Sequence, residues 1–104
     1  MRSEDDRIED ILEAIDKIDK FKPASLDQLG RDEMVYVWVI HHLQIIGEAA
    51  SKLPELIKKK YPTINWSQII TLRNIVVHEY FGIEPKEIWN TITYDLPLLK
   101  QTLS

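Results

Sequence analysis

The sequence has 104 residues, of which 44% are hydrophobic and 29% charged, and its net charge is −4 at pH 7. This length and balance predict one soluble globular domain over residues 1–104. The excess of acidic side chains argues against a broadly basic nucleic-acid-binding domain, but it is compatible with a small basic site. Because there are no cysteines, disulfides and thiolate metal sites are excluded.

The N-terminal stretch Met1–Asp6 is polar and acidic, unlike a signal peptide. No apolar run approaches the roughly 20 residues that cross a bilayer. Together with the lack of cysteine, these features predict a cytoplasmic protein without a membrane segment.

Apolar residues recur at three- and four-residue steps near the N-terminus, which predicts a helix from Ser3 or Glu4 to Phe21. Ser3 is expected to cap this helix, and Lys22 with Pro23 to end it. A short helical turn is expected over Ser25–Leu29, closed by Gly30. The apolar stripe of the first helix consists of Ile8, Ile11, Leu12, Ile15 and Ile18.

A second long helix is predicted from Asp32, a good N-cap residue, to about Leu53. Its apolar residues are too widely distributed for a single stripe, so this helix must bury more than one side. A subunit interface would explain the second buried side, and so would a central position in a helical bundle. The apolar set comprises Met34, Val35, Val37, Trp38, Ile40, Leu43, Ile45, Ile46, Ala49, Ala50 and Leu53.

The second half of the chain also predicts helices. A short helix is expected over Pro54–Lys60, with Pro54 in its first turn. A longer helix is expected over Asn65–Phe81, capped by Thr63 or Asn65 and stopped by Gly82.

The last helix is predicted from Pro85 to about Leu103. Pro97 lies inside it and should kink it or split it in two, because proline lacks a backbone N–H. Short connections between helices favour antiparallel neighbours. We therefore expect an all-α, up-and-down bundle of about four to five helices, which forms a dimer.

Residues 73–80, Arg-Asn-Ile-Val-Val-His-Glu-Tyr, place ionisable groups in an otherwise apolar segment. On a helix, Asn74 and His78 share a face, as do Arg73 and Tyr80. Arg73 and His78 differ in direction by roughly 140°. Two copies of this helix packed across a two-fold axis could bring both side chains to one site, which makes a composite site at a dimer interface a natural hypothesis.

An Arg, a His and a polar amide are suited to RNA cleavage by internal transfer. His78 can move a proton near neutral pH, and the Arg73 guanidinium matches phosphate oxygens. Asn74 can orient the His or bind a phosphate oxygen. On spacing alone another interpretation stays open, in which His78 is a core histidine, Arg73 pairs on the surface with Glu79, and Tyr80 is a packed aromatic.

The motif resembles the signature of the HEPN superfamily, and more closely its HepT-like branch. The resemblance extends over most of the chain, well beyond the motif itself. The other segments that carry it are Gly47-Glu48-Ala49-Ala50, Pro54, Trp66-Ser67-Gln68-Ile69-Ile70, Tyr80-Phe81-Gly82-Ile83 and Ile88-Trp89.

The resemblance implies an all-α homodimer with a metal-independent endoribonuclease site and no cofactor. By the same resemblance Arg73 and His78 are the catalytic pair, Asn74 supports them, and tRNA or mRNA is the substrate. The partner would be a cognate minimal nucleotidyltransferase antitoxin that adenylylates Tyr80 and so blocks the toxin. The alternative function is a non-catalytic dimeric partner or scaffold of a nucleotidyltransferase, with a nucleotide-binding or regulatory role.

For several other residues the sequence allows more than one role. Glu48 follows a glycine in an apolar stretch, so it is either a buried second-shell partner of Arg73 or a surface residue. A lysine cluster around Tyr61 either binds RNA phosphates or complements a helix end; it comprises Lys52, Lys58, Lys59 and Lys60. His41 and His42 are adjacent, point in different directions on a helix, and are not expected to form a metal pair.

Overall fold

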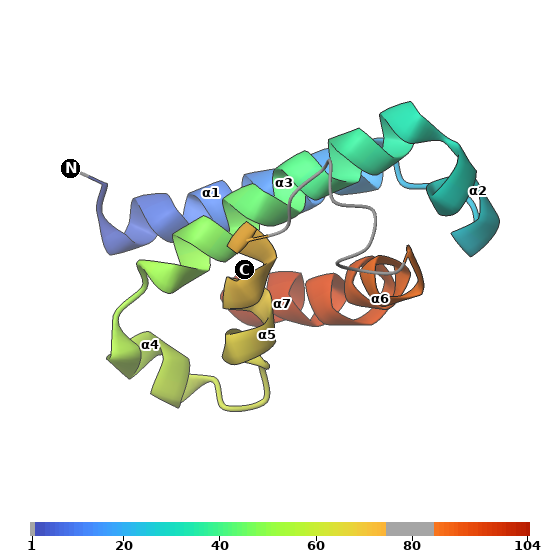
Figure 1. The fold of residues 1–104 in the computed structure, drawn as a ribbon. Coiled ribbons are helices and arrows are strands. Elements are labelled where there is room, and N and C mark those ends of the chain that lie inside the picture. The colour runs from blue at the N-terminus through green and yellow to red at the C-terminus, as the bar shows by residue number, and fades with distance from the viewer. Residues whose placement is uncertain (1, 75–84) are drawn as a thin grey trace.

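The computed structural model describes residues 2–74 and 85–104, and all regular elements in these two ranges are helical. α1 (Glu4–Lys20) and α3 (Glu33–Ser51) lie side by side and antiparallel, joined through the short α2 (Leu26–Arg31) (Figure 1). The prediction of an all-α fold is confirmed. Within the described ranges, no helix is both long enough and apolar enough to cross a membrane.

The remaining elements pack around this helix pair. α5 and the 3-10 turn η1 contact α3, α6 contacts α2, and α7 contacts α1. The elements after α3 are α4 (Glu55–Lys60), α5 (Trp66–Thr71), η1 (Leu72–Asn74), α6 (Pro85–Asn90), the π-helical η2 (Thr91–Asp95) and α7 (Leu96–Leu103). α3 is therefore covered by α1 on one side and by α5 with η1 on another.

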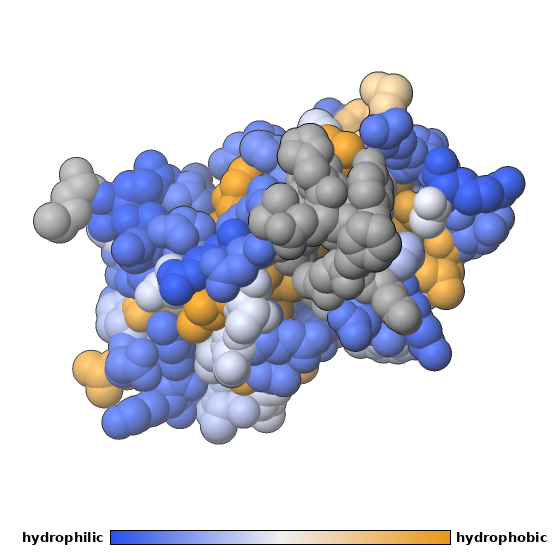
Figure 2. All heavy atoms as spheres, viewed as in Figure 1, coloured by the Kyte–Doolittle hydropathy of each residue, from blue (hydrophilic) through white to orange (hydrophobic). Residues whose placement is uncertain are grey.

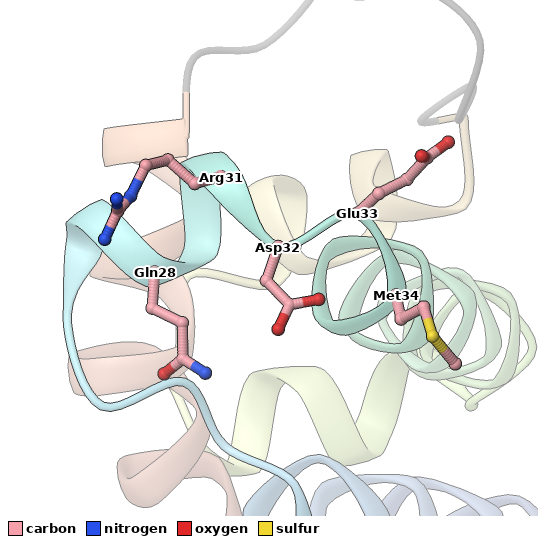
Figure 3. A pocket seen from close by; sticks show the side chains of 5 residues that line it. All are labelled: Gln28, Arg31, Asp32, Glu33 and Met34. Carbon is pink, nitrogen blue, oxygen red and sulfur yellow. The ribbon is translucent and has the colours of Figure 1, made fainter.

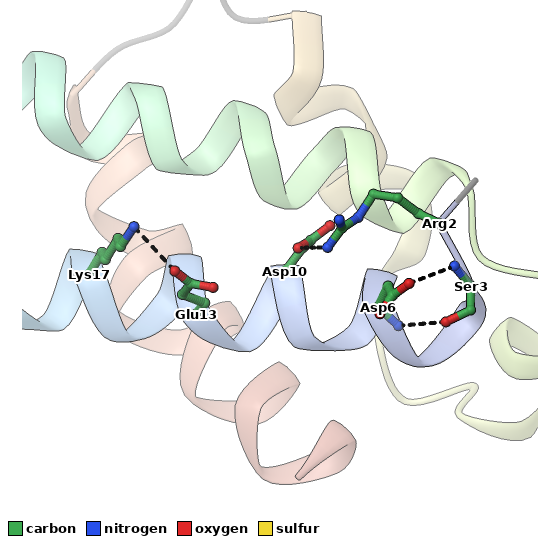
Figure 4. A network of polar contacts seen from close by, with 6 residues as sticks. All are labelled: Arg2, Ser3, Asp6, Asp10, Glu13 and Lys17. Carbon is green, nitrogen blue, oxygen red and sulfur yellow. Dashed lines mark hydrogen bonds and ion pairs between the residues drawn. The ribbon is translucent and has the colours of Figure 1, made fainter.

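Side chains cap the helices where the sequence predicts. The Ser3 hydroxyl accepts a hydrogen bond from the backbone N–H of Asp6 at 3.1 Å, and the Asp6 carboxylate accepts one from the N–H of Ser3 at 3.0 Å (Figure 4). This reciprocal pair is a capping box. Asp32 caps α3, and Asn65 rather than Thr63 caps α5.

One hydrophobic core joins all layers of the fold. Ile11, Ile15 and Ile18 of α1 are fully buried, which confirms the apolar stripe of the first helix. Trp66 is buried in the core and Trp89 packs against it, whereas Trp38 lies at its edge. The surface seen in Figure 2 is mostly hydrophilic, with small hydrophobic patches between the polar side chains.

One predicted helix end is wrong, and one predicted α-helix changes type along its length. Gly30 does not close a turn, because α2 continues through it to Arg31 and no described glycine has a positive φ. The α-helix expected over Asn65–Phe81 ends at Thr71 and continues as η1. The rest of that predicted helix, with its stop at Gly82, lies outside the described residues.

Pro97 disturbs the last helix as predicted, and the structure shows how. The proline ring at position 97 would collide with the carbonyl group of Thr93 in a regular α-helix. The turn before it, Thr91–Asp95, widens to a π-helix and relieves that collision. The chain continues into α7 without a break, so the helix is locally unwound rather than split in two.

Candidate functional site

Arg73 and Asn74 lie together on η1, at the end of α5. Both side chains are exposed, while their neighbour Leu72 is buried in the core. Leu72 therefore anchors the turn and leaves the guanidinium and the amide free to meet a ligand. A guanidinium held in this way can contact two phosphate oxygens at once.

Gly47 on α3 allows this turn to approach closely. A Cβ atom at position 47 would lie 2.5 Å from the backbone nitrogen of Arg73 and 3.0 Å from the carbonyl oxygen of Ile69. Real Cβ atoms are not found this close to backbone atoms, so only glycine fits here without a shift. The sequence shows Gly47 as part of a family element, but the contact that requires it depends on the distant η1.

His78 and Tyr80 lie outside the described residues. The predictions that Asn74 and His78 share a helix face, and that Arg73 and His78 point roughly 140° apart, also fall on residues outside the described ranges. The composite site therefore stays a prediction from the sequence, and the structure describes only its Arg73 and Asn74 part.

Glu48 does not have the buried setting that a charged partner of Arg73 would need. Its side chain is 53% exposed and its carboxylate lies 4.0 Å from the ammonium group of Lys52. Adjacent positions on a helix point about 100° apart, so Gly47 faces η1 while Glu48 faces solvent. The structure favours the alternative interpretation of Glu48 as a surface residue.

The two adjacent histidines have different surroundings. His42 is buried, and its Nδ1 donates a hydrogen bond to the carbonyl oxygen of Trp38 at 2.8 Å. Burial lowers the pKa of His42 below its ordinary value of 6.5, although this hydrogen bond opposes the shift. His41 is exposed, and its ring lies 4.9 Å from that of His42 between ring centres. Within the described ranges, no group of three or more potential ligands could hold a metal ion.

The outer face of α3 carries an exposed row that we call the α3 stripe: Met34, Val37, His41 and Ile45. These residues recur at three- and four-residue steps and therefore share one face of the helix. Met34 is 83% exposed, which is unusual for so large an apolar side chain. Part of the broad apolar surface that the sequence of α3 predicts therefore stays exposed after α3 packs against α1 and α5.

Two shallow hollows lie at the start of α3. One, of about 450 Å³, is lined by Gln28, Arg31, Asp32, Glu33 and Met34 (Figure 3). The other, of about 490 Å³, runs along the α3 stripe beside Trp38 and His41. Arg73 is not among the described residues that line either hollow.

Comparisons with known proteins agree with the resemblance read from the motif. The family described as "Ribonuclease HepT-like" matches residues 11–104. "Probable ribonuclease HepT" of Thermococcus cleftensis is 36% identical over 100 residues, covering 95% of this chain and 91% of the relative.

Two further relatives have similar names. "Putative RNase MJ1216" of Methanocaldococcus jannaschii is 33% identical over 93 residues, 88% of this chain and 77% of the relative. "Putative RNase TTE0752" of Caldanaerobacter subterraneus is 32% identical over 84 residues, 81% of this chain and 75% of the relative. No solved structure matches the chain significantly. The HepT-like prediction is confirmed, and the chain belongs to the ribonuclease HepT-like family.

Proposed function

We propose that this ribonuclease is a metal-independent endoribonuclease and the toxin of a cytoplasmic toxin–antitoxin system, with tRNA or mRNA as its substrate. The observation that carries the proposal is the exposed Arg73 on a turn held by Leu72 and Gly47. His78 follows five residues later in the sequence, so a phosphate-binding group and a proton-transfer group belong to one segment.

The reaction needs one proton removed, one proton supplied and negative charge stabilised. The 2′-oxygen of the ribose forms a bond to the adjacent phosphorus, and the bond from phosphorus to the 5′-oxygen breaks. His78 removes the 2′-OH proton or protonates the leaving 5′-oxygen. Arg73 and Asn74 stabilise the charge that develops on the phosphorane oxygens.

The active form that we propose is a homodimer paired through the α3 stripe. An exposed apolar row on a 19-residue helix is a surface that a second copy can bury. If the two-fold axis is perpendicular to α3, the two helices run antiparallel, and the Glu33 end of one faces the oppositely charged Lys52 end of the other.

The proposed partner is a minimal nucleotidyltransferase antitoxin that transfers AMP from ATP to Tyr80. The phenolic oxygen would form a bond to the α-phosphorus, with pyrophosphate as the leaving group. Bulk and negative charge next to His78 would then exclude RNA phosphates.

The test is RNA cleavage in EDTA by purified protein, after intact mass has shown that Tyr80 carries no AMP. We expect His78→Ala and Arg73→Ala to lose cleavage of total tRNA and mRNA by about 100-fold or more. Arg31→Ala is the matched control, since Arg31 is exposed and pairs only with Asp27 among the described residues. No cleavage by unmodified wild-type protein would favour the scaffold function instead.

A further inference from the structure

Charge is unevenly divided along this acidic chain. Residues 49–74 contain five basic side chains and a single acidic one, Glu55, although the whole chain has 13 basic and 17 acidic residues. The basic set consists of Lys52, Lys58, Lys59, Lys60 and Arg73. The proposed catalytic arginine therefore belongs to the one strongly basic part of an acidic molecule.

Lys52 and Arg73 lie near the same end of α3. Lys52 follows Gly47 by five residues, about 7.5 Å along the axis of α3, and Gly47 contacts the backbone of Arg73. α4 and α5 follow directly after this end of α3 (Figure 1). We call Lys52, Lys58, Lys59 and Lys60 the lysine platform.

The connection between α4 and α5 is held in place. The Trp66 indole donates a hydrogen bond to the carbonyl oxygen of Tyr61 at 3.1 Å, and Ile64 between them is buried. Ile57 packs against the core from α4. Because these contacts fix the backbone, the lysine platform keeps a defined position relative to the helix that leads to Arg73.

Lys52, Lys59 and Lys60 are exposed and available to a ligand, whereas the Lys58 side chain is only 12% exposed and contributes less. Lys59 is exposed and forms no ion pair within residues 2–74 and 85–104. Lys60 lies 5.5 Å from the centre of the neutral Tyr61 ring. The pair of Lys52 with Glu48 at 4.0 Å joins two exposed side chains, so it is weak and exchangeable. Lys58 pairs with the exposed Glu55 at 3.5 Å.

We propose that the lysine platform binds the phosphate backbone of the RNA substrate, at nucleotides away from the phosphate that is cleaved. This inference rests on the proposed ribonuclease function. The binding would be independent of sequence and would depend on salt, because bound lysines release counterions from the RNA. A binding surface outside a small active site supplies affinity that the few groups of the motif cannot supply alone.

The alternative occupant is an acidic protein. Leu56 on α4 is 80% exposed beside the lysine platform, and a protein partner would bury it. An RNA backbone would not need this leucine. Leu56→Ser therefore distinguishes the two ligands.

The experiment measures binding of a fluorescein-labelled single-stranded RNA of mixed sequence to the full-length His78→Ala protein, in which cleavage does not interfere. Adding Lys59→Glu and Lys60→Glu should weaken binding about tenfold at low salt. Adding Lys20→Glu and Lys22→Glu is the matched control, which makes the same charge change near the end of α1 and should alter affinity less than about twofold. Leu56→Ser should leave RNA binding unchanged.

If the Lys59→Glu, Lys60→Glu variant and the Lys20→Glu, Lys22→Glu variant lose RNA affinity equally, the effect is one of net charge and the proposal is wrong. The proposal is also wrong if neither variant changes RNA affinity. If Lys59→Glu with Lys60→Glu and Leu56→Ser weaken binding of the nucleotidyltransferase but not of RNA, the platform docks a protein instead. Cleavage by the wild-type protein is measured separately. The ribonuclease proposal and the platform proposal can therefore fail independently.

Discussion

Gly47 and Arg73 are in direct contact through their backbones: a Cβ atom at position 47 would lie 2.5 Å from the amide nitrogen of Arg73. A position on one long helix thus controls how close the motif turn comes to the core. The proposed catalytic arginine is placed by a residue that has no side chain.

Gly47→Ala should therefore damage both stability and activity. The added methyl group must push η1 away from α3, which we expect to cost about 1–3 kcal/mol of unfolding free energy. The displaced Arg73 should also reduce RNA cleavage. Chemical denaturation and a cleavage assay on the same preparation measure the two effects.

Gly30→Ala is the matched control for that substitution. Among the described residues, a Cβ atom at position 30 meets only Pro85, at an ordinary 3.9 Å, and the position is helical. We expect Gly30→Ala to be neutral or to stabilise the protein by up to about 1 kcal/mol. Equal destabilisation by both alanine substitutions would contradict the role given to Gly47.

His42 should make the stability of the protein depend on pH near neutrality. Its pKa is lowered in the folded state by burial, so the unfolded chain binds a proton first as the pH falls below about 6.5. Folding stability should therefore decrease as pH falls through this value, and should stop changing below the folded pKa.

His42→Leu removes this titration and keeps the position apolar. Between about pH 7.5 and about pH 5, the wild-type protein should lose more unfolding free energy than His42→Leu does. Denaturant titrations at several pH values provide the comparison, in which carboxylates contribute equally to both proteins. Parallel pH profiles would show that the burial of His42 does not control this dependence.

Met34→Glu should dissociate the proposed dimer. It puts a charge within an interface that would have to bury it, so we expect the dimer dissociation constant to rise at least about tenfold. Leu56→Glu is the matched control, because Leu56 is 80% exposed and Met34 is 83% exposed but only Met34 belongs to the α3 stripe. Light scattering coupled to size-exclusion chromatography measures the mass. A dimer that tolerates Met34→Glu would place the subunit interface elsewhere.

Adenylylation should be specific to Tyr80. After incubation with the cognate nucleotidyltransferase and ATP, intact mass spectrometry should detect added AMP on the wild type and none on Tyr80→Phe. Tyr94 is 68% exposed, so Tyr94→Phe is the control that tests whether exposure alone is sufficient. If Tyr80→Phe still gains AMP and Tyr94→Phe does not, the acceptor is Tyr94 and not Tyr80.

The sequence determines much of the local structure of this protein. Ser3, Asp32 and Asn65 cap helices as predicted, because a cap depends only on a side chain and the backbone three residues later. Pro97 likewise disturbs its own helix, since the proline ring collides with a carbonyl group four residues earlier. The family also follows from the sequence alone, through the motif residues and their spacing.

Only the tertiary structure decides how these elements meet. Gly47 fits because η1, far away in the sequence, packs against it, and Glu48 is exposed because the adjacent position faces that contact. The apolar surface of α3 is predicted by its composition, but which part stays exposed depends on where α1 and α5 pack. Hydrophobicity identifies side chains that avoid water, whereas the particular neighbour that covers each one follows from contacts across the whole fold.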